Sequence, residues 1–188
     1  MKNFLFSLCI LTLLTAASAC NKDDTPKPVE QELITTVRLT LTKVSDSSIR
    51  TFTYKVENGF TDPSGTVQID TIRLNSNSVY DAVVTLLNEK ESPAKDITAE
   101  VVSESDDHLF LYTYVAGSGG PSLSISNGNR DGSNEPFNQT FRLTAAGAGL
   151  GSLTVSLIHE PTDKYATSTN TAGGKTEVEA TFPVRFEP

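Results

Sequence analysis

The chain has 188 residues, with 23 acidic and 15 basic side chains that give a formal net charge of −8. Nucleic acids and anionic membrane surfaces are bound through clusters of Lys and Arg, and the sequence shows no such cluster, so we expect neither as a partner. The length suits one domain with a single core.

Residues 1–19 have the pattern of a signal peptide. Lys2 supplies a positive start, residues 4–14 form an apolar run, and Ala17 and Ala19 provide the small side chains of a cleavage site. The apolar run is too short for a membrane-spanning helix, which needs about 20 such residues. Cys20 follows the expected cleavage site and is the only cysteine left after it, so we expect no disulfide in the mature fold.

Cys20 and the residues after it resemble the mature start of a bacterial lipoprotein. The resemblance implies that the thiol carries a diacylglycerol and that the freed amine is acylated, for example with palmitate. Two or three acyl chains anchor a protein stably, whereas one does not. Ordinary secretion remains the alternative, because Ala17 and Ala19 also suit the general signal peptidase, and lipoprotein signals usually carry Leu where Ala17 stands.

Lys22, Asp23 and Asp24 resemble the short export tag of surface lipoproteins in Bacteroidota. The resemblance implies a lipid-anchored protein of the outer membrane that faces the cell exterior, with the periplasm as the alternative. Residues 20–32 are polar and contain two prolines, so they predict a solvated, disordered tether. A compact domain is expected over residues 33–188.

Alternation of apolar and polar side chains dominates this domain and predicts half-buried strands. The apolar faces are Val37, Leu39 and Leu41; Phe52, Tyr54 and Val56; Leu153, Val155 and Leu157; and Val178, Ala180, Phe182, Val184 and Phe186. Residues 78–87 and 108–115 are apolar on both faces, which indicates central strands. Pro183 indicates an edge strand, because proline cannot donate to a ladder.

Turn residues separate these runs, and only one helix is indicated, where Asp96 precedes Ile97 and Val101 at helical spacing. We therefore predict an all-β fold: a single antiparallel β-sandwich of seven to nine strands, Ig-like in broad architecture, with at most one short helix.

Residues 33–43, the segment from Ile97 to His108, and residues 152–161 and 177–184 together resemble a group of small Bacteroidota surface lipoproteins. Proteins of this group are associated with TonB-dependent outer-membrane receptors. The resemblance therefore implies such a receptor as a partner.

The sequence predicts no enzyme and no cofactor. It lacks a nucleophile elbow, a phosphate-binding glycine loop and a dinucleotide fingerprint. Paired carboxylates for glycoside hydrolysis stay open, because their separation is spatial. The favoured function is a binding or accessory module that uses the loops at 117–121 and 127–136, and a purely structural surface protein is the alternative.

His108 and His159 carry a second alternative, the capture of a divalent metal or of haem. Each lies at a strand end beside an acid, Asp107 in one case and Glu160 in the other, and such side chains suit zinc, copper or nickel. His108 begins its strand and His159 ends its own, so the two meet if the strands are antiparallel. The other interpretation is two solvated residues at the sheet margin.

Residues 127–132 partly resemble a calcium loop, because Asn127, Asn129 and Asp131 place oxygen atoms at alternate positions. Only Asp131 and Glu135 add charge, so the pattern predicts weak calcium binding at best. Asn-Gly and Asp-Gly pairs are also good turns, and we favour that interpretation.

Asp70, Thr71 and Ile72 match the short pattern that is O-glycosylated on threonine in Bacteroidota surface proteins. A three-residue match arises often by chance. Thr71 is therefore a candidate modification site and carries no function by itself.

Overall fold

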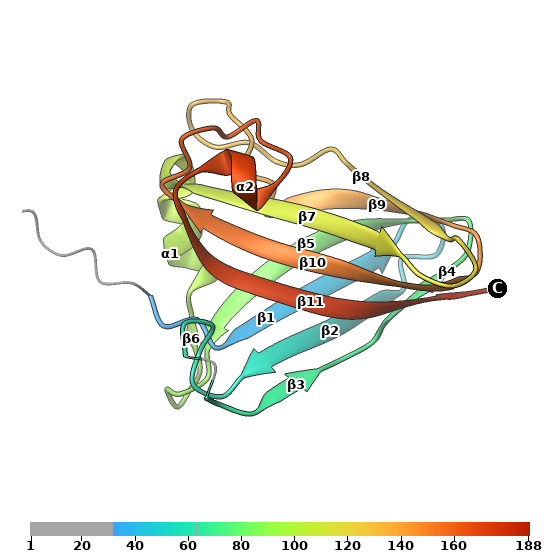
Figure 1. Cartoon of the computed structure of the whole chain (residues 1–188), viewed down its shortest axis with the longest axis horizontal. Helices are drawn as coiled ribbons and strands as arrows, with labels where there is room; N and C mark the ends of the chain where they lie inside the picture. Colours follow the sequence, from blue (N-terminus) through green and yellow to red (C-terminus); the bar gives the residue numbers. More distant parts are fainter. Residues whose placement is uncertain (1–31, 63) are drawn as a thin grey trace, which may run out of the picture. The chain divides into compact units, whose positions relative to one another are not determined.

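The computed structural model describes residues 32–62 and 64–188, in which Glu32–Pro188 form one compact unit (Figure 1). Cys20 and the expected export tag at Lys22, Asp23 and Asp24 lie outside the described residues. No helix in the described part of the chain has the length and apolarity to span a membrane.

Two β-sheets make up the unit. The larger sheet has the strand order β3-β2-β1-β5-β9-β8, with β6 paired to β5, and the smaller has the order β4-β11-β10-β7. The strands of the larger sheet are β1 (Thr36–Lys43), β2 (Ile49–Val56), β3 (Val67–Ile69), β5 (Ser78–Asn88), β6 (Lys95–Asp96), β8 (Ser122–Ser126) and β9 (Thr140–Ala146). Those of the smaller sheet are β4 (Ile72–Asn75), β7 (His108–Ala116), β10 (Gly149–His159) and β11 (Lys175–Glu187).

The predicted all-β sandwich is confirmed, and its core consists of the alternating side chains that the sequence indicated. Leu39 of β1, Leu153 of β10 and Phe182 of β11 are fully buried, and they belong to one cluster that fills the space between the sheets. The period of two places these residues on the inner face of each strand, so burial of that face drives the two sheets together.

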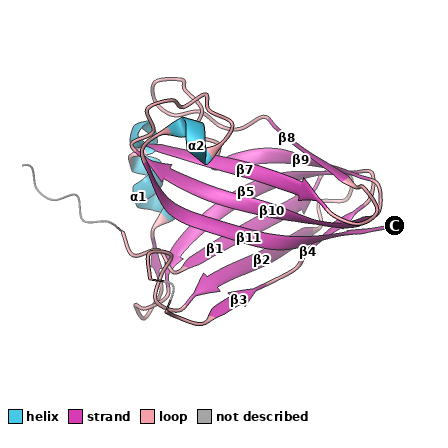
Figure 2. Ribbon diagram, in the orientation of Figure 1, coloured by secondary structure: helices cyan, strands magenta, loops and turns pink. Residues whose placement is uncertain are grey.

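Helices are more numerous than expected. The chain forms α1 (Thr98–Ser103), a 3₁₀ turn at Ser105–Asp107, and α2 (Thr169–Ala172), all at one end of the sandwich (Figure 2). The first is the predicted helix: Asp96 accepts a hydrogen bond from the Thr98 main-chain N–H at 2.8 Å, and Val101 is buried. The second has four residues, which is too short to show helical periodicity in the sequence.

The strand count and the purely antiparallel pairing also need correction. Eleven strands form over the described residues, because β3 and β6 are two or three residues long and give no readable alternation. One pair, β4 with β11, is parallel, with Val184 opposite Ile72. The other pairs are antiparallel.

Pro183 is the last residue of the part of β11 that has a neighbouring strand on one side only. Strand β11 stands between β4 and β10, but its pairing with β4 covers only Val184–Glu187. Residues 175–183 thus have a paired strand on the β10 side alone. The proline rule therefore applies to part of the strand and not to the whole of it.

The prediction that residues 108–115 form a central strand is wrong. Strand β7 is the edge of the smaller sheet and pairs only with β10. Its outer face is apolar because Leu109 and Leu111 pack with Ile158 of β10 and Ala172 of α2 in a second, small cluster. The segment 160–174 therefore covers the outer face of β7. This cover explains why an edge strand is apolar on both faces, as a central strand would be.

This second cluster can be tested with two residues on the same face of β7. Leu109 is fully buried, whereas Val115 is 59% exposed. We expect Leu109→Ala to lower the free energy of unfolding by about 2–5 kcal/mol, and Val115→Ala to change it by less than about 0.5 kcal/mol. Urea unfolding of both variants measures the difference, and equal effects would contradict a covered outer face.

Candidate functional site

The two histidines meet at the end of the sandwich where α1 and α2 lie. His108 and His159 are directly opposite in the pairing of β7 with β10, and their rings stack with centroids 4.8 Å apart and planes 12° apart. His108 is buried, and its Nδ1 donates to the Glu104 carbonyl oxygen at 2.9 Å. The antiparallel argument from the sequence therefore located the two side chains correctly with respect to each other.

A third side chain, which the sequence did not indicate, completes this cluster. The carboxylate of Glu177 lies 3.4 Å from His159 Nδ1 and 3.8 Å from His108 Nε2, and it is almost entirely buried. The ladder between β10 and β11 skips Glu177, because Val178 pairs with Leu157 and Thr176 pairs with Ile158. A β-bulge re-aims a side chain, and this one accounts for an acid that faces the two imidazoles.

Asp107 and Glu160, the acids expected beside the histidines, are exposed and do not join the cluster. Their main chains bind each other instead, since the Glu160 N–H donates to the Asp107 carbonyl oxygen at 2.7 Å. Sequence adjacency to a strand-end histidine was the wrong guide, because both acids lie just outside the strands, Asp107 in the 3₁₀ turn and Glu160 after the end of β10.

The geometry of the cluster does not suit a metal ion. Among the described residues, no group of three or more His, Cys, Asp or Glu side chains is arranged to hold one. Nearly parallel rings direct their in-plane nitrogen lone pairs along parallel planes rather than toward one point, as a tetrahedral ion requires. A haem ligated by both would have to lie between the rings, and they stack on each other.

Three loops close this end of the sandwich around one buried cation. Lys164, which is 7% exposed, donates to the Ser105 carbonyl oxygen at 2.7 Å and the Asp106 carbonyl oxygen at 3.1 Å, and it forms an ion pair with Asp131. Burial works to raise the pKa of Asp131, but the Lys164 ammonium and nearby main-chain N–H groups outweigh it and lower that pKa. The segments 104–107, 127–139 and 160–174 are thus joined by one ammonium group.

Two of the four suspected calcium residues, Asp131 and Asn129, use their side-chain oxygen atoms within the turn. Asp131 also accepts hydrogen bonds from the main-chain N–H groups of Ser133 and Glu135, and Asn129 accepts one from Thr140. The two side chains therefore hold the loop itself, as the turn interpretation proposed. Calcium binding at Asn127, Asn129, Asp131 and Glu135 stays a prediction.

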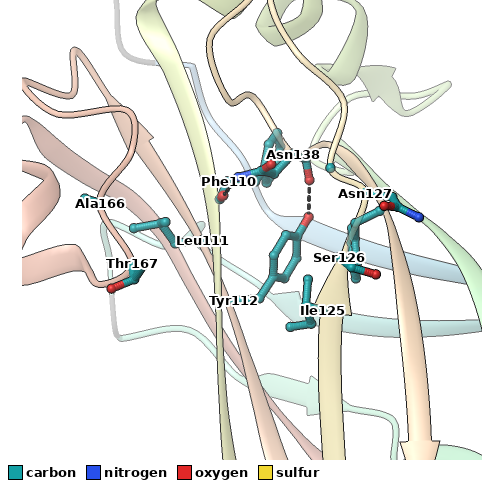
Figure 3. Close-up of a pocket in the computed structure, with 11 residues that line it drawn as sticks. Phe110, Leu111, Tyr112, Ile125, Ser126, Asn127, Asn138, Ala166 and Thr167 are labelled. Atoms are coloured by element: carbon teal, nitrogen blue, oxygen red, sulfur yellow. Dashed lines mark hydrogen bonds between the residues drawn. The ribbon is translucent and has the colours of Figure 1, made fainter.

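Beside this closed end lies an open cleft of about 240 Å³ (Figure 3). Its lining comes from β7, from β8 and the loop after it, from β9, and from the segment 166–167. Every side chain in it is uncharged: Phe110, Leu111, Tyr112, Ile125, Ser126, Asn127, Asn138, Phe141, Ala166 and Thr167, with Gly128 between them. A side chain at Gly128 would collide with the amide of Asn138, so any larger residue there would displace that side chain.

Tyr112 fixes one wall of the cleft. Its hydroxyl donates to the Asn138 carbonyl oxygen at 2.6 Å, and its ring packs against Phe141 with centroids 4.0 Å apart. Burial raises the pKa of Tyr112 well above its usual value, so the hydroxyl remains a donor. These contacts therefore hold the aromatic wall of the cleft in one position.

Two other residues or segments singled out in the sequence lie elsewhere. Thr71 falls between β3 and β4 rather than within a strand, and the adjacent Asp70 accepts a hydrogen bond from the Thr53 main-chain N–H at 2.8 Å. The loop at 117–121 joins β7 to β8 at the end of the sandwich opposite the helices (Figure 1). Of the two loops predicted to bind a partner, the one at 127–136 contributes to the lining of the cleft and the one at 117–121 does not.

No family model, no curated protein and no solved structure matches this chain. The function must therefore be argued from the site itself.

The ion pair between Lys164 and Asp131 gives a prediction about stability. Lys164→Met leaves the buried Asp131 carboxylate without its cation, so we expect a loss of about 3–5 kcal/mol in the free energy of unfolding. The double variant Lys164→Met/Asp131→Asn should be more stable than the sum of the single effects predicts.

The matched control is the exposed pair of Arg142 and Asp81, whose atoms approach to 2.8 Å. Arg142→Met and Asp81→Asn should each cost about 1 kcal/mol or less. Urea unfolding measures all variants, and a Lys164→Met protein as stable as Arg142→Met would show that the cation does not hold the loops.

The buried histidine predicts a dependence of stability on pH. Burial lowers the pKa of His108, but the Glu177 carboxylate, the Glu104 carbonyl group and the Glu104 charge outweigh it, so the pKa lies above its ordinary value. A raised histidine pKa adds stability that is complete below about pH 6.5 and is lost as the pH rises through the folded-state pKa. Glu177→Gln should therefore reduce the gain in stability between pH 8 and pH 6.

Glu179→Gln, on an exposed neighbour in the same strand, should keep that gain. Glu32 contributes with the same sign, because burial and the nearby Glu100 raise its pKa to about 7, so the difference between variant and wild type is the relevant quantity. Urea unfolding at pH 6, 7 and 8 gives it. Parallel pH curves for wild type and Glu177→Gln would contradict the assigned cause.

Proposed function

We propose that this protein is a non-enzymatic binding module, held at the outer membrane by a lipid on Cys20 and facing the cell exterior. One observation carries the binding function, namely the uncharged cleft between β7 and β8. Ligand sites are concave and lined by apolar and aromatic side chains with a few polar groups, and this cleft has such a lining. A TonB-dependent receptor is the partner that the family resemblance suggests.

The construction of the walls supports this proposal. One wall follows β8 into the loop 127–139, and another is the segment 166–167 (Figure 3). Lys164, which lies in the segment 160–174, binds Asp131 of the loop 127–139 and the Ser105 carbonyl oxygen of the 3₁₀ turn, so it holds both walls at that turn. Loops that are held by a rigid scaffold are the usual place for recognition, so binding here requires little ordering of the protein.

The N-terminal sequence supports the anchor. Cys20 directly follows a signal-peptide pattern, and Lys22, Asp23 and Asp24 follow the cysteine. In this proposal the polar residues after Cys20 serve as the tether between the lipid and the sandwich.

Cross-linking on intact cells tests the proposal, with a tag at the C-terminus. Thr167 is exposed at the mouth of the cleft, and Ile49, which is 67% exposed, lies on β2 of the larger sheet. We expect quantitative mass spectrometry to recover an outer-membrane protein with wild type and with Ile49→Trp. Recovery should fall about tenfold with Thr167→Trp, which corresponds to about 1.4 kcal/mol of lost binding energy.

Three outcomes would contradict parts of the proposal. Equal recovery with Thr167→Trp would mean that the cleft is not the binding site. Recovery of no envelope protein with wild type would favour a purely structural surface protein. A Cys20→Ala protein that still incorporates labelled palmitate and stays with the membrane would show that the anchor is elsewhere.

A further inference from the structure

Along the edge of β7 beside the cleft, the main-chain groups of Phe110, Tyr112 and Tyr114 point away from β10, and only those of Phe110 have hydrogen-bond partners among the described residues. The Phe110 main-chain N–H donates to the Phe137 carbonyl oxygen at 2.9 Å, and the Asn138 side chain donates to the Phe110 carbonyl oxygen at 3.2 Å. Both groups of Phe110 therefore point away from β10. Because main-chain groups alternate in direction along an antiparallel strand, those of Tyr112 and Tyr114 point the same way.

These groups have no partner strand. Strand β7 pairs with β10 alone, and none of the hydrogen bonds found among the described residues uses the main-chain N–H or carbonyl of Tyr112 or Tyr114. At Phe110 the edge is thus covered by one main-chain hydrogen bond to Phe137 and one side-chain hydrogen bond from Asn138, and the chain then continues into β9. From Tyr112 onward this cover is missing.

This edge also lacks the features that normally protect one. Exposed edges are usually blunted by charged side chains, by proline, by bulges or by extreme shortness. Strand β7 has nine residues, and residues 109–116 contain no charge and no proline. The parallel edge strand β4, in contrast, has four residues and carries Arg73.

From these observations we infer that the edge of β7 over Tyr112–Ala116 docks an extended segment of a partner protein, which pairs with β7 where the hydrogen bonds to Phe137 and Asn138 end. The inference rests on the proposed binding function and names the class of its ligand. A paired strand supplies the N–H and carbonyl groups that Tyr112 and Tyr114 lack, as in β-strand addition. Since the cleft lining is uncharged, the side chain that enters it from the segment is apolar or neutral.

The test uses the mature chain with Cys20→Ala, which keeps it unlipidated, and random linear dodecapeptides displayed on phage as the probe. Selected peptides are then synthesised, and hydrogen exchange of the main-chain amides is measured by NMR. We expect the amides of Tyr112 and Tyr114 to gain at least tenfold protection at saturation. Those of Thr113 and Val115 point toward β10 and should not change.

Main-chain substitution of the peptide gives a second readout. N-methylation at alternate residues removes the donors of one side of a strand only. One alternate set should therefore weaken binding at least tenfold, and the other set should have little effect. Thr167→Trp should also weaken binding, and Ile49→Trp should leave it unchanged.

Failure of this inference can be told apart from failure of the proposed function. No binding peptide, unchanged exchange at Tyr112 and Tyr114, or equal effects of the two N-methylated sets would each overturn the strand-docking inference. If Thr167→Trp still loses a partner on intact cells, the cleft binds a ligand of another class. A peptide-free dimer in sedimentation that Thr167→Trp disrupts would assign the edge to a second copy of this chain and also overturn it.

Discussion

The closed end of the sandwich depends on a single buried ammonium group. Lys164 has three N–H donors, and they meet two main-chain carbonyl oxygens and the Asp131 carboxylate. A buried charge is tolerated only when it is fully paired, so the three segments must keep their positions together. The turn at 105–107 sets where β7 begins, and the other two segments form walls of the cleft. The start of β7, where His108 lies, and two walls of the cleft therefore share one electrostatic constraint.

The histidine cluster is best understood as part of this closed end. Its imidazoles stack on each other, one ring donates to the Glu104 carbonyl oxygen, and Glu177 approaches both. Burying a carboxylate costs free energy unless a positive charge compensates it, and the raised pKa of His108 favours the protonated imidazole that can compensate it. The cluster thus links the stability of this end to pH without offering lone pairs that converge on an ion. Two histidines at matched strand ends are not sufficient evidence of a metal site.

The sequence predicted the parts of this fold that repeat and failed where one residue breaks the repeat. Alternation located the inner faces of β1, β10 and β11 because burial follows the period of a strand. The same alternation places Glu177 on the outer face beside Glu179, and only the bulge turns it inward. The contact between Lys164 and Asp131 joins two loops 33 residues apart, for which no periodic signal exists. Strand β7 was predicted to be central but lies at an edge of its sheet. A strand covered by a loop on its outer face is as apolar on both faces as a central strand, so the sequence pattern does not distinguish them.

The two halves of strand β7 differ in how they are covered. Near His108 its outer face is covered by the segment 160–174, and the main-chain groups of Phe110 on its edge are hydrogen-bonded to Phe137 and Asn138. Beyond Leu111 both forms of cover end together, although the sequence stays apolar and uncharged through Ala116. A strand needed only for stability would gain from charge or proline on such an edge, because either protects against unwanted pairing. Its exposed half therefore keeps an aggregation-prone composition that makes physical sense if a specific partner strand pairs with it.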